Sequence, residues 1–557
     1  MSKINIIPLS GVRENGKNCY VIEVDEDIFI LDAGLKYPET ELLGIDVVIP
    51  NFSYLAENKD RVAGIFLTHG HADAIGALPY LLADVDVPVF GSELTIELAK
   101  LTVSNYADTK KFKEFHVVND ATEIDFGDTT ISFFRTTHTI PESLGIQVKT
   151  PEGSIVYTGD FKFDQAAEPA FATDFARLAQ IGAEGVLALL SDSSNAESRV
   201  QTNSEHEIAE EIAETIATWE GRIIVASVAS NLARIQQVID AAFASERKIL
   251  LTGKDVEKIV RTAMRLGKII LPDEKIFIKQ NELSRYENSQ ILILETGRMG
   301  EPMKSLQRMA KGAYGNVSIQ KGDLVYIVTT PSTAMETVVA KTEDMIYRAD
   351  GMVKLINENL RVSGHGNAHD LQLLLNLMKP KCLIPVQGEY RQLDAHADLA
   401  LEIGVPEVYI THRGDVLNYE KNEGKFVPNG SVPADNVMID GLGVGDIGNI
   451  VLRDRKVLSE DGILVAVTTI SRKDKKIVSR PQVTSRGFVY QKTSRDILKE
   501  SGNIVEEVVS QHLGDPDFEW GKLKQDIRDA LAKYLFEQTK RRPVILPVIM
   551  ESSFRRR

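Results

Sequence analysis

Short runs of apolar and β-branched residues, separated by Gly, Asn and Asp, dominate the first part of the chain. They include INIIPLSGV at 4–12, IFILDAG at 28–34, VAGIFLTH at 62–69 and TISFFRTTH at 130–138. Runs of this length between turn-forming residues are typical of β-strands. The stretches 74–83 and 93–103 instead favour helices. We therefore expect a β-rich domain with a few helices up to about residue 165.

The pattern changes near residue 206, where strand-like and helical segments begin to alternate. An amphipathic helix is predicted at 205–220, a buried strand at 222–227 and a further helix at 231–245. Such alternation is typical of a parallel sheet with covering helices. The later stretch 418–436 is polar and rich in Gly, Pro and Asn, so it is the best linker candidate. Beyond it, the pattern predicts a small α+β domain.

Composition narrows the class of protein. Of 557 residues, 43% are apolar and 26% are charged, which is typical of a globular protein and excludes a mainly disordered or coiled-coil chain. The 64 Lys and Arg against 80 Asp and Glu give a formal charge of −16. This balance argues against a broad nucleic-acid-binding surface, because Lys and Arg drive phosphate binding. Residues 451–557 differ, since they carry 22 basic and 15 acidic side chains, a net charge of +7.

Cysteines and apolar stretches restrict the location of the protein. Cys19 and Cys382 are the two cysteines, which excludes a disulfide framework and a cysteine-rich zinc module. The N-terminal residues lack a basic segment followed by an apolar core, so we expect no signal peptide. No stretch approaches the roughly 18 apolar residues of a membrane helix. We therefore expect a cytoplasmic protein without membrane association.

Histidine and aspartate residues follow several of the predicted strands. His69, His71 and Asp73 come after the apolar run VAGIFLT, and His138 and Asp160 each follow another apolar strand. Sites are often built where strands of a sheet end, and imidazole with carboxylate suits Zn²⁺ or Mn²⁺. H-x-H-x-D alone is also compatible with a solvated loop. The further ligand types at the ends of other strands, His138 and Asp160, favour a metal site.

Several motifs resemble the β-CASP branch of the metallo-β-lactamase superfamily and occur in its order. They are HGHAD (69–73), TTHTIP (136–141), YTGDFKFD (157–164), LLSDSSNAE (189–197), RVSGHG (361–366) and PVQGEYR (385–391). The segments 439–455 (IDGLGVGDIGNIVLRDR) and 485–490 (SRGFVY) are similar to the C-terminal region of bacterial ribonuclease J. The chain thus resembles the ribonuclease J family, and within it the degenerate second paralogue of Gram-positive bacteria.

The resemblance implies an α/β fold with several domains. It predicts a metallo-β-lactamase αββα sandwich formed by 1–205 and 356–417, with a β-CASP α/β domain inserted at 206–355. A linker at 418–445 and a C-terminal α+β domain at 446–557 are expected to follow.

The resemblance also implies two metal positions. One ion is expected to be bound by His69, His71, His138 and Asp160. The second ion is expected to share Asp160 and to use Asp73 with two further histidines. The family pattern H-x-H-x-D-H has Ala74 as its last residue here, and P-x-H-G-E-Y has Gln387 at its histidine. Alanine has no donor atom and a neutral amide is a weak ligand, so we expect one weakly held Zn²⁺ or Mn²⁺ ion, or none.

Catalytic and substrate-binding residues are likewise implied by the resemblance. The catalytic candidates are Asp73, Asp192 and His365, of which His365 is expected to contact the scissile phosphate. Without the resemblance, Asp192 would be interpreted as a turn or helix cap and His365 as a loop histidine. Asp32 is expected to orient a histidine ring from outside the metal site.

Two segments are expected to bind substrate. They are Ser230 with Asn231, similar to a 5′-phosphate pocket, and Arg361, Val362, Ser363, Gly364 and His365, which could form a phosphate nest. Ala233 replaces the histidine usual in the family, and the loop 329–337 also departs from its pattern. The 5′-phosphate pocket is therefore expected to be impaired.

The function implied is RNA processing and decay, including mRNA turnover and rRNA maturation. We expect a 5′–3′ exoribonuclease with some endonuclease activity, weak alone because the second metal position is degenerate. The alternative is a catalytically inactive subunit that binds single-stranded RNA and supports an intact ribonuclease J paralogue.

The resemblance also implies assembly. The expected partners are the intact paralogue and an RNA-decay complex, with a homodimer when the chain is alone. A small-molecule hydrolase is disfavoured because the β-CASP insertion fills the space for compact substrates. A DNA-processing relative stays an alternative, because no residue pattern marks recognition of the 2′-hydroxyl.

Overall fold

The computed structural model describes residues 3–38, 42–253, 256–297, 301–315, 317–330, 335–356, 360–441, 443–445, 447–489 and 494–552. The chain divides into two compact units, Met1–Tyr37 with Val47–Val437 and Pro38–Asp46 with Met438–Arg557. No helix in the described ranges is both long enough and apolar enough to cross a bilayer.

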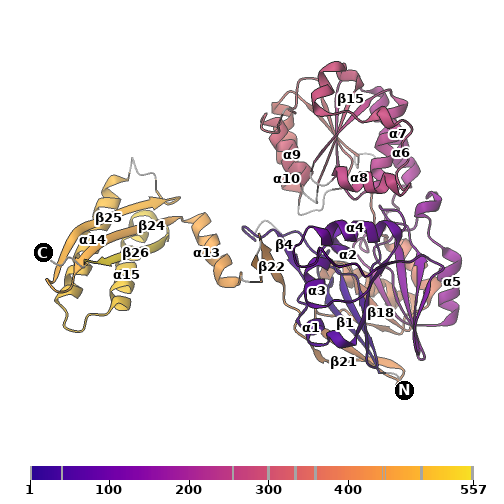
Figure 1. The fold of residues 1–557 in the computed structure, drawn as a ribbon, viewed down its shortest axis with the longest axis horizontal. Helices are drawn as coiled ribbons and strands as arrows, with labels where there is room; N and C mark the ends of the chain where they lie inside the picture. Colours follow the sequence, from indigo (N-terminus) through magenta and orange to yellow (C-terminus); the bar gives the residue numbers. More distant parts are fainter. Residues whose placement is uncertain are drawn as a thin grey trace. The chain divides into compact units, whose positions relative to one another are not determined.

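Two large sheets form the centre of the first unit (Figure 1). In spatial order, the first sheet contains β21 (Lys425–Ser431), β20 (Asp415–Glu420), β1 (Ile4–Ser10), β2 (Cys19–Val24), β3 (Asp27–Leu31), β5 (Val62–Phe66), β6 (Val89–Gly91) and β7 (Phe115–Val117). The second contains β19 (Glu407–Val408), β18 (Cys382–Val386), β12 (Val186–Asp192), β11 (Gly153–Tyr157), β10 (Leu144–Thr150), β9 (Thr129–Arg135) and β8 (Glu123–Phe126). One hydrophobic core joins them, with Tyr20 and Phe29 from the first sheet and Ile146 and Ile155 from the second. Because both sheets bury apolar side chains in this core, they form a sandwich.

Helices cover the sandwich. Apolar residues of α5 (Phe175–Glu184), α11 (Ala368–Met378) and α12 (Tyr390–Ile403) form a second core with the other face of the second sheet. The first sheet is accompanied by α1 (Ser53–Glu57), α2 (Ala72–Ile75), α3 (Leu78–Asp84) and α4 (Glu93–Ser104). The helix predicted at 74–83 is interrupted at Gly76 and Ala77, whereas the one predicted at 93–103 is confirmed. The expected αββα class is confirmed.

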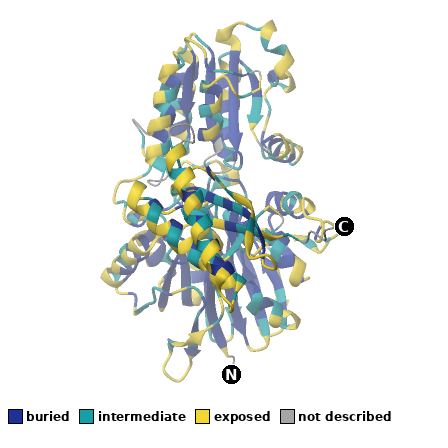
Figure 2. Cartoon of the chain, turned by 90° about the vertical axis from the view of Figure 1, so that its left-hand side faces the viewer, coloured by how far each residue is buried: buried dark blue, intermediate teal, exposed yellow. Residues whose placement is uncertain are grey.

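The inserted segment forms a separate parallel sheet. Its strands are, in spatial order, β14 (Lys248–Gly253), β15 (Ile291–Gly297), β13 (Ile223–Val228), β16 (Leu324–Ile327) and β17 (Met352–Leu355), with every neighbouring pair parallel. Its helices are α6 (Glu205–Thr218), α7 (Leu232–Ala244), α8 (Val256–Arg265), α9 (Glu301–Ala310) and α10 (Glu336–Arg348). From β13 the chain first forms β14 and β15 on one side and then crosses to form β16 and β17 on the other side. The carboxyl end of β13 is therefore next to a change of direction in the strand order, which is a typical position for a site. Figure 2 colours most of the strands as buried and the outer sides of the helices as exposed.

The stretch 418–445, predicted to be a linker, was interpreted wrongly over its first part. β20 and β21 form an antiparallel hairpin there, and Asn5 of β1 pairs with Asn418. Tyr419 and Phe426 reach the core between the sheets, with exposures of 9% and 1%. Along both strands these few apolar residues alternate with polar residues that face outward. The overall composition is therefore polar, which led to the interpretation as a linker. The short pair β22 (Val437–Asp440) and β23 (Gly443–Val444) follows.

The second unit is a small α+β domain, as expected. Its central strand β24 (Ile463–Ser471) pairs antiparallel with β25 (Lys476–Arg486) and parallel with β26 (Val544–Glu551). The helices α14 (Arg495–Gly514) and α15 (Trp520–Thr539) pack on one face of this sheet through residues such as Val509, Ile527 and Leu531. The helix α13 (Asn449–Glu460) precedes β24. The last residue of the predicted motif 485–490 and the basic end of the chain at 553–557 lie outside the described residues.

Candidate metal centre

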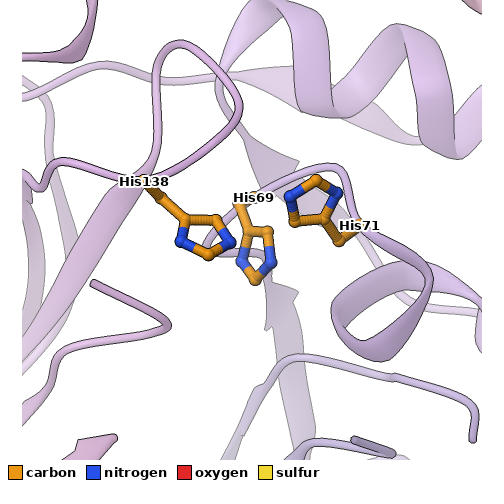
Figure 3. Close-up of side chains that lie close together, drawn as sticks. All are labelled: His69, His71 and His138. Atoms are coloured by element: carbon orange, nitrogen blue, oxygen red, sulfur yellow. The ribbon is translucent and has the colours of Figure 1, made fainter. Parts of the chain in front are cut away.

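Three histidine rings meet where strands of both sheets end. His69 follows β5, His71 is the N-cap residue of α2, and His138 follows β9. The ring centroids lie 4.9 Å apart for His69 and His71 and 5.0 Å from each of these to His138. One nitrogen of each ring lies within 4.8 Å of the other two (Figure 3). The three predicted ligands are therefore brought together in an arrangement that could hold a metal ion.

Hydrogen bonds on the far side of two rings fix the direction in which they point. The Thr68 hydroxyl donates to Asp32 and lies 2.9 Å from Nδ1 of His69, which therefore donates to Thr68. Nδ1 of His138 donates to the carbonyl oxygen of Gly364 at 2.8 Å. In both rings Nε2 is left for a ligand, and that of His69 is buried with no hydrogen-bond partner among the described residues. This half of the site fits a cation.

Asp32 and Gly364 support these rings by different means. Asp32 accepts from the Thr68 backbone at 2.8 Å and from the Tyr157 hydroxyl at 2.9 Å, so it orients His69 through Thr68. At Gly364 a Cβ atom would lie 2.9 Å from Thr139 Cγ2 and 3.1 Å from His138 Cε1. Glycine therefore lets this loop pack closely on the histidine. Thr68 and Thr139 were missed by sequence reasoning, although each directly adjoins a motif histidine.

His71 differs from the other two rings because both of its nitrogens have a partner. Nδ1 lies 2.7 Å from the Ser230 hydroxyl, and Nε2 lies 2.8 Å from the Thr139 hydroxyl. Ser230 lies in the loop between β13 and α7, so the predicted 5′-phosphate residue is in direct contact with a predicted metal ligand. Its neighbour Asn231 caps α7 by accepting from the Arg234 backbone at 3.0 Å.

The second half of the site is built around Gln387, which follows β18. Its amide nitrogen lies 3.1 Å from Asp73 Oδ2 and 3.2 Å from Asp160 Oδ2, and it donates to both. Its amide oxygen accepts from the Gly16 backbone at 2.8 Å, which fixes the orientation of the side chain. Ala74 is fully buried and has no donor atom. The amide N–H thus occupies Oδ2 of both carboxylates, whereas Asp160 Oδ1 is buried without a hydrogen-bond partner among the described residues.

Burial and neighbouring charges together shift the pKa values of the titratable groups here. Burial lowers the pKa of His69, but Asp73 and Asp160 outweigh burial and raise that pKa to about 9. Burial, assisted by His69, lowers the pKa of His71 to about 3. Burial and the neighbouring Asp73 raise the pKa of Asp160 well above its usual range. The carboxylates therefore favour a positive charge at His69, whether a proton or a metal ion.

A further acid and histidine pair lies beside the triad. Asp192, the last residue of β12, accepts from His365 Nδ1 at 2.7 Å and from the Ser194 backbone at 2.9 Å. Burial lowers the pKa of His365, but Asp192 outweighs burial and raises the pKa to about 10. The ring centroid of His365 lies 5.5 Å from that of His138. A histidine that stays protonated is thus held next to the triad.

The predicted segment 361–365 forms the loop that carries this histidine. The Ser363 hydroxyl accepts from the backbone N–H of His365 at 3.0 Å, so this N–H is already engaged. The Arg361 backbone donates to Asn203, and the Val362 carbonyl accepts from Thr330 at 3.0 Å. The bond to Thr330 ties the loop to the inserted domain. Residues 331–334 of the predicted loop 329–337 lie outside the described residues.

Two sheets that share a core, with this site at their strand ends and a parallel α/β insertion, define a metal-dependent hydrolase of the metallo-β-lactamase superfamily with a β-CASP domain. Residues 12–199 match the metallo-β-lactamase superfamily, and residues 220–346 match the ribonuclease J β-CASP domain. Residues 350–410 match the Zn-dependent metallo-hydrolase RNA specificity domain, and residues 450–552 match the ribonuclease J C-terminal domain. The chain belongs to the ribonuclease J family.

Relatives over the full length agree with this assignment. The chain is 60% identical to ribonuclease J 2 of Streptococcus pyogenes serotype M3, covering 99% of this chain and 100% of that protein. It is 45% identical to ribonuclease J2 of Bacillus subtilis over 98% of each chain. A crystal structure of a protein of unknown function from Enterococcus faecalis has the same fold over 75% of this chain and 100% of its own, with a TM-score of 0.55 and 16% identity. Within its family, the chain is therefore of the second-paralogue type.

Proposed function

We propose that the chain acts in RNA processing and decay as a ribonuclease J-type protein whose metal centre holds at most one divalent cation. The observation that carries this proposal is the Gln387 amide, which donates to Asp73 and Asp160 at 3.1 and 3.2 Å. A metal ion that binds these two Oδ2 atoms must displace the amide N–H of Gln387. The three histidines then remain as the donors for one Zn²⁺ or Mn²⁺ ion.

One cation is expected to support slow cleavage. Zn²⁺ or Mn²⁺ at the histidines would polarise a phosphoryl oxygen, whereas a two-metal site clamps both the attacking and the leaving oxygen. Asp73 Oδ1 lies 3.7 Å from His69 Nε2 and is placed to act as the base. His365 stays protonated beside Asp192 and would donate a hydrogen bond to a phosphate oxygen. We expect 5′–3′ exonuclease activity with some endonuclease activity, both weak.

Single-stranded RNA is the proposed substrate. The match of residues 350–410 to an RNA specificity domain supports this, and so does membership of the ribonuclease J family. The loop 361–365 and the pair Ser230 and Asn231 are proposed to meet the phosphates. Because Ser230 contacts His71 and Ala233 offers no imidazole, recognition of the 5′ phosphate is expected to be weak.

A second candidate function is a non-catalytic subunit. The observation in its favour is that Ala74 and Gln387 both replace ligands of the same metal position. That position would then lack two of its ligands at once. In this case the chain would bind RNA in the cytoplasm and support an intact ribonuclease J paralogue within an RNA-decay complex. Alone, it is proposed to form a homodimer.

Metal content and cleavage together test the proposal. We expect the natively purified protein to hold no more than one Zn²⁺ or Mn²⁺ ion per chain and to degrade 5′-monophosphorylated RNA slowly. Two firmly bound ions, or cleavage as fast as that of an intact family member, would overturn it. His69→Ala and His71→Ala variants, assayed with the intact paralogue, separate the two candidates. Unchanged activity of the complex would select the non-catalytic subunit.

A further inference from the structure

The contact between Ser230 and His71 links the inserted domain to the metal centre. Ser230 follows β13, and its hydroxyl lies 2.7 Å from His71 Nδ1. Three residues further on, in the first turn of α7, the Ala233 backbone donates to the carbonyl oxygen of Thr139 at 3.2 Å. The β13–α7 loop and the start of α7 therefore contact both histidine segments of the sandwich, at His71 and beside His138.

Buried charges hold the start of α7 in this position. Arg234, in the first turn of α7, is 1% exposed, and its Nη2 lies 3.4 Å from Glu205 Oε2. The other oxygen of Glu205 lies 2.7 Å from Nζ of Lys162, which is also 1% exposed. Lys162 follows Asp160 by two residues, so the network connects α7 to the strand end that carries a metal-site carboxylate. Separating such buried charges is costly, so Ser230 is held firmly against His71.

Hydrogen bonding sets His71 apart from the other rings of the triad. His69 and His138 each have one ring nitrogen bonded, to Thr68 and Gly364, and the other nitrogen is left for a ligand. A metal-bound histidine normally has such a partner on its second nitrogen. His71 already has this partner in Thr139, which adjoins His138 in the sandwich itself. The Ser230 hydroxyl is the additional contact.

A nitrogen bonded to a hydroxyl cannot bind a metal ion at the same time. In a neutral imidazole, one nitrogen carries the proton and the other carries the lone pair. Since both nitrogens of His71 face hydroxyl groups, one of these two bonds must break before the ring becomes a ligand.

We propose that the Ser230 hydroxyl competes with a divalent cation for His71, so that the position of the β13–α7 loop sets the affinity of the histidine triad. This inference rests on the proposed function, in which the triad is the remaining cation site. Loss of one hydrogen bond between neutral groups corresponds to about 1 kcal/mol. Removing the hydroxyl should therefore strengthen cation binding by about 3- to 10-fold.

Calorimetric titration of the chelator-treated full chain with Mn²⁺ tests this. Ser230→Ala should bind about 3- to 10-fold more tightly than the wild type, and Ser230→Thr, which keeps a hydroxyl, should bind like the wild type. Thr139→Val should bind more weakly, because it removes the group that orients the ring. Ser227→Ala, in β13 just before this loop, is the matched control and should leave binding unchanged.

Each other outcome has a defined meaning. Equal or weaker binding by Ser230→Ala, including the absence of binding in both proteins, overturns the competition. Tighter binding by Thr139→Val reverses the assignment of the two hydroxyls and also overturns it. His138→Ala distinguishes the underlying function, because binding that survives this change places the cation outside the triad. In that case the proposed single-cation centre fails, whatever Ser230 does.

Discussion

The two halves of the candidate metal centre are held by neighbouring strand ends, but their donor atoms face different partners. In the histidine half, Nε2 of His69 is buried and makes no hydrogen bond within the described chain. In the carboxylate half, Asp73 and Asp160 both accept from the amide of Gln387. Each half keeps one buried atom without a hydrogen bond among the described residues, Nε2 of His69 and Oδ1 of Asp160, but only in the carboxylate half does a side-chain N–H lie between the donor atoms. A hydrogen bond from the chain can therefore hold two neighbouring carboxylates together.

The largest effect is expected from removing a ligand in the histidine half. His138→Ala should weaken Mn²⁺ binding by about 100-fold or more, because loss even of a ligand's outer partner costs about 10- to 100-fold. Calorimetric titration measures the change. His116→Ala, which alters a half-exposed histidine on β7, is the control and should bind like the wild type. Similar binding by the two variants would remove the distinction between the halves.

The next largest effect is expected in the carboxylate half. Gln387→Leu removes the donor shared by Asp73 and Asp160 and leaves the Gly16 backbone without its acceptor, so unfolding free energy should fall by about 3 kcal/mol. Urea denaturation measures the loss, with Gln372→Leu on the exposed face of α11 as the control. Added Mn²⁺ should restore part of the lost stability, because the freed carboxylates can then bind it. Unchanged stability would show that the amide does not replace a cation.

A smaller effect is expected on RNA binding when Asp192, which belongs to neither half, is changed. In Asp192→Asn, His365 loses its charged partner and its pKa should fall from about 10 towards the ordinary 6.5. The ring then becomes neutral at about pH 8, and affinity for single-stranded RNA should drop by about 10-fold there and recover near pH 6. Fluorescence anisotropy with labelled RNA measures this, with Asp394→Asn as the control. A variant whose affinity is independent of pH would exclude His365 as the phosphate contact.

The smallest effect is on the pH dependence of stability and concerns His396, which lies outside both halves. Its contribution must be known before a pH dependence can be assigned to the metal centre. Burial lowers the pKa of His396 to about 4, so the unfolded chain binds more protons than the folded chain between this value and 6.5. Stability should therefore fall as the pH decreases through this window, by about 1 kcal/mol between roughly pH 6 and pH 5. In His396→Asn this contribution should disappear from urea midpoints measured against pH. The same slope in the variant would assign the acid sensitivity to other groups.

Local patterns predicted most of the fold. The alternation of strands and helices after residue 206 follows from hydrophobic periodicity, which depends on neighbouring residues, whereas the αββα class was implied by the resemblance of the motifs to the ribonuclease J family. The hairpin β20–β21 was missed because its few core residues, Tyr419 and Phe426, are hidden among polar neighbours. Their burial depends on β1, which lies more than 400 residues earlier in the chain.

By itself, the sequence determined which donor atoms exist. The spacing of His69, His71 and Asp73 after one strand can be read from adjacent residues, and comparison with the family's motifs gives the replaced ligands at Ala74 and Gln387. Only the tertiary structure decided what those atoms face. The amide of Gln387 lies between two carboxylates. The Ser230 hydroxyl contacts His71, although Ser230 and His71 are 159 positions apart. Hydrogen bonds form over about 3 Å, so they depend on how distant segments pack, which motif spacing does not contain.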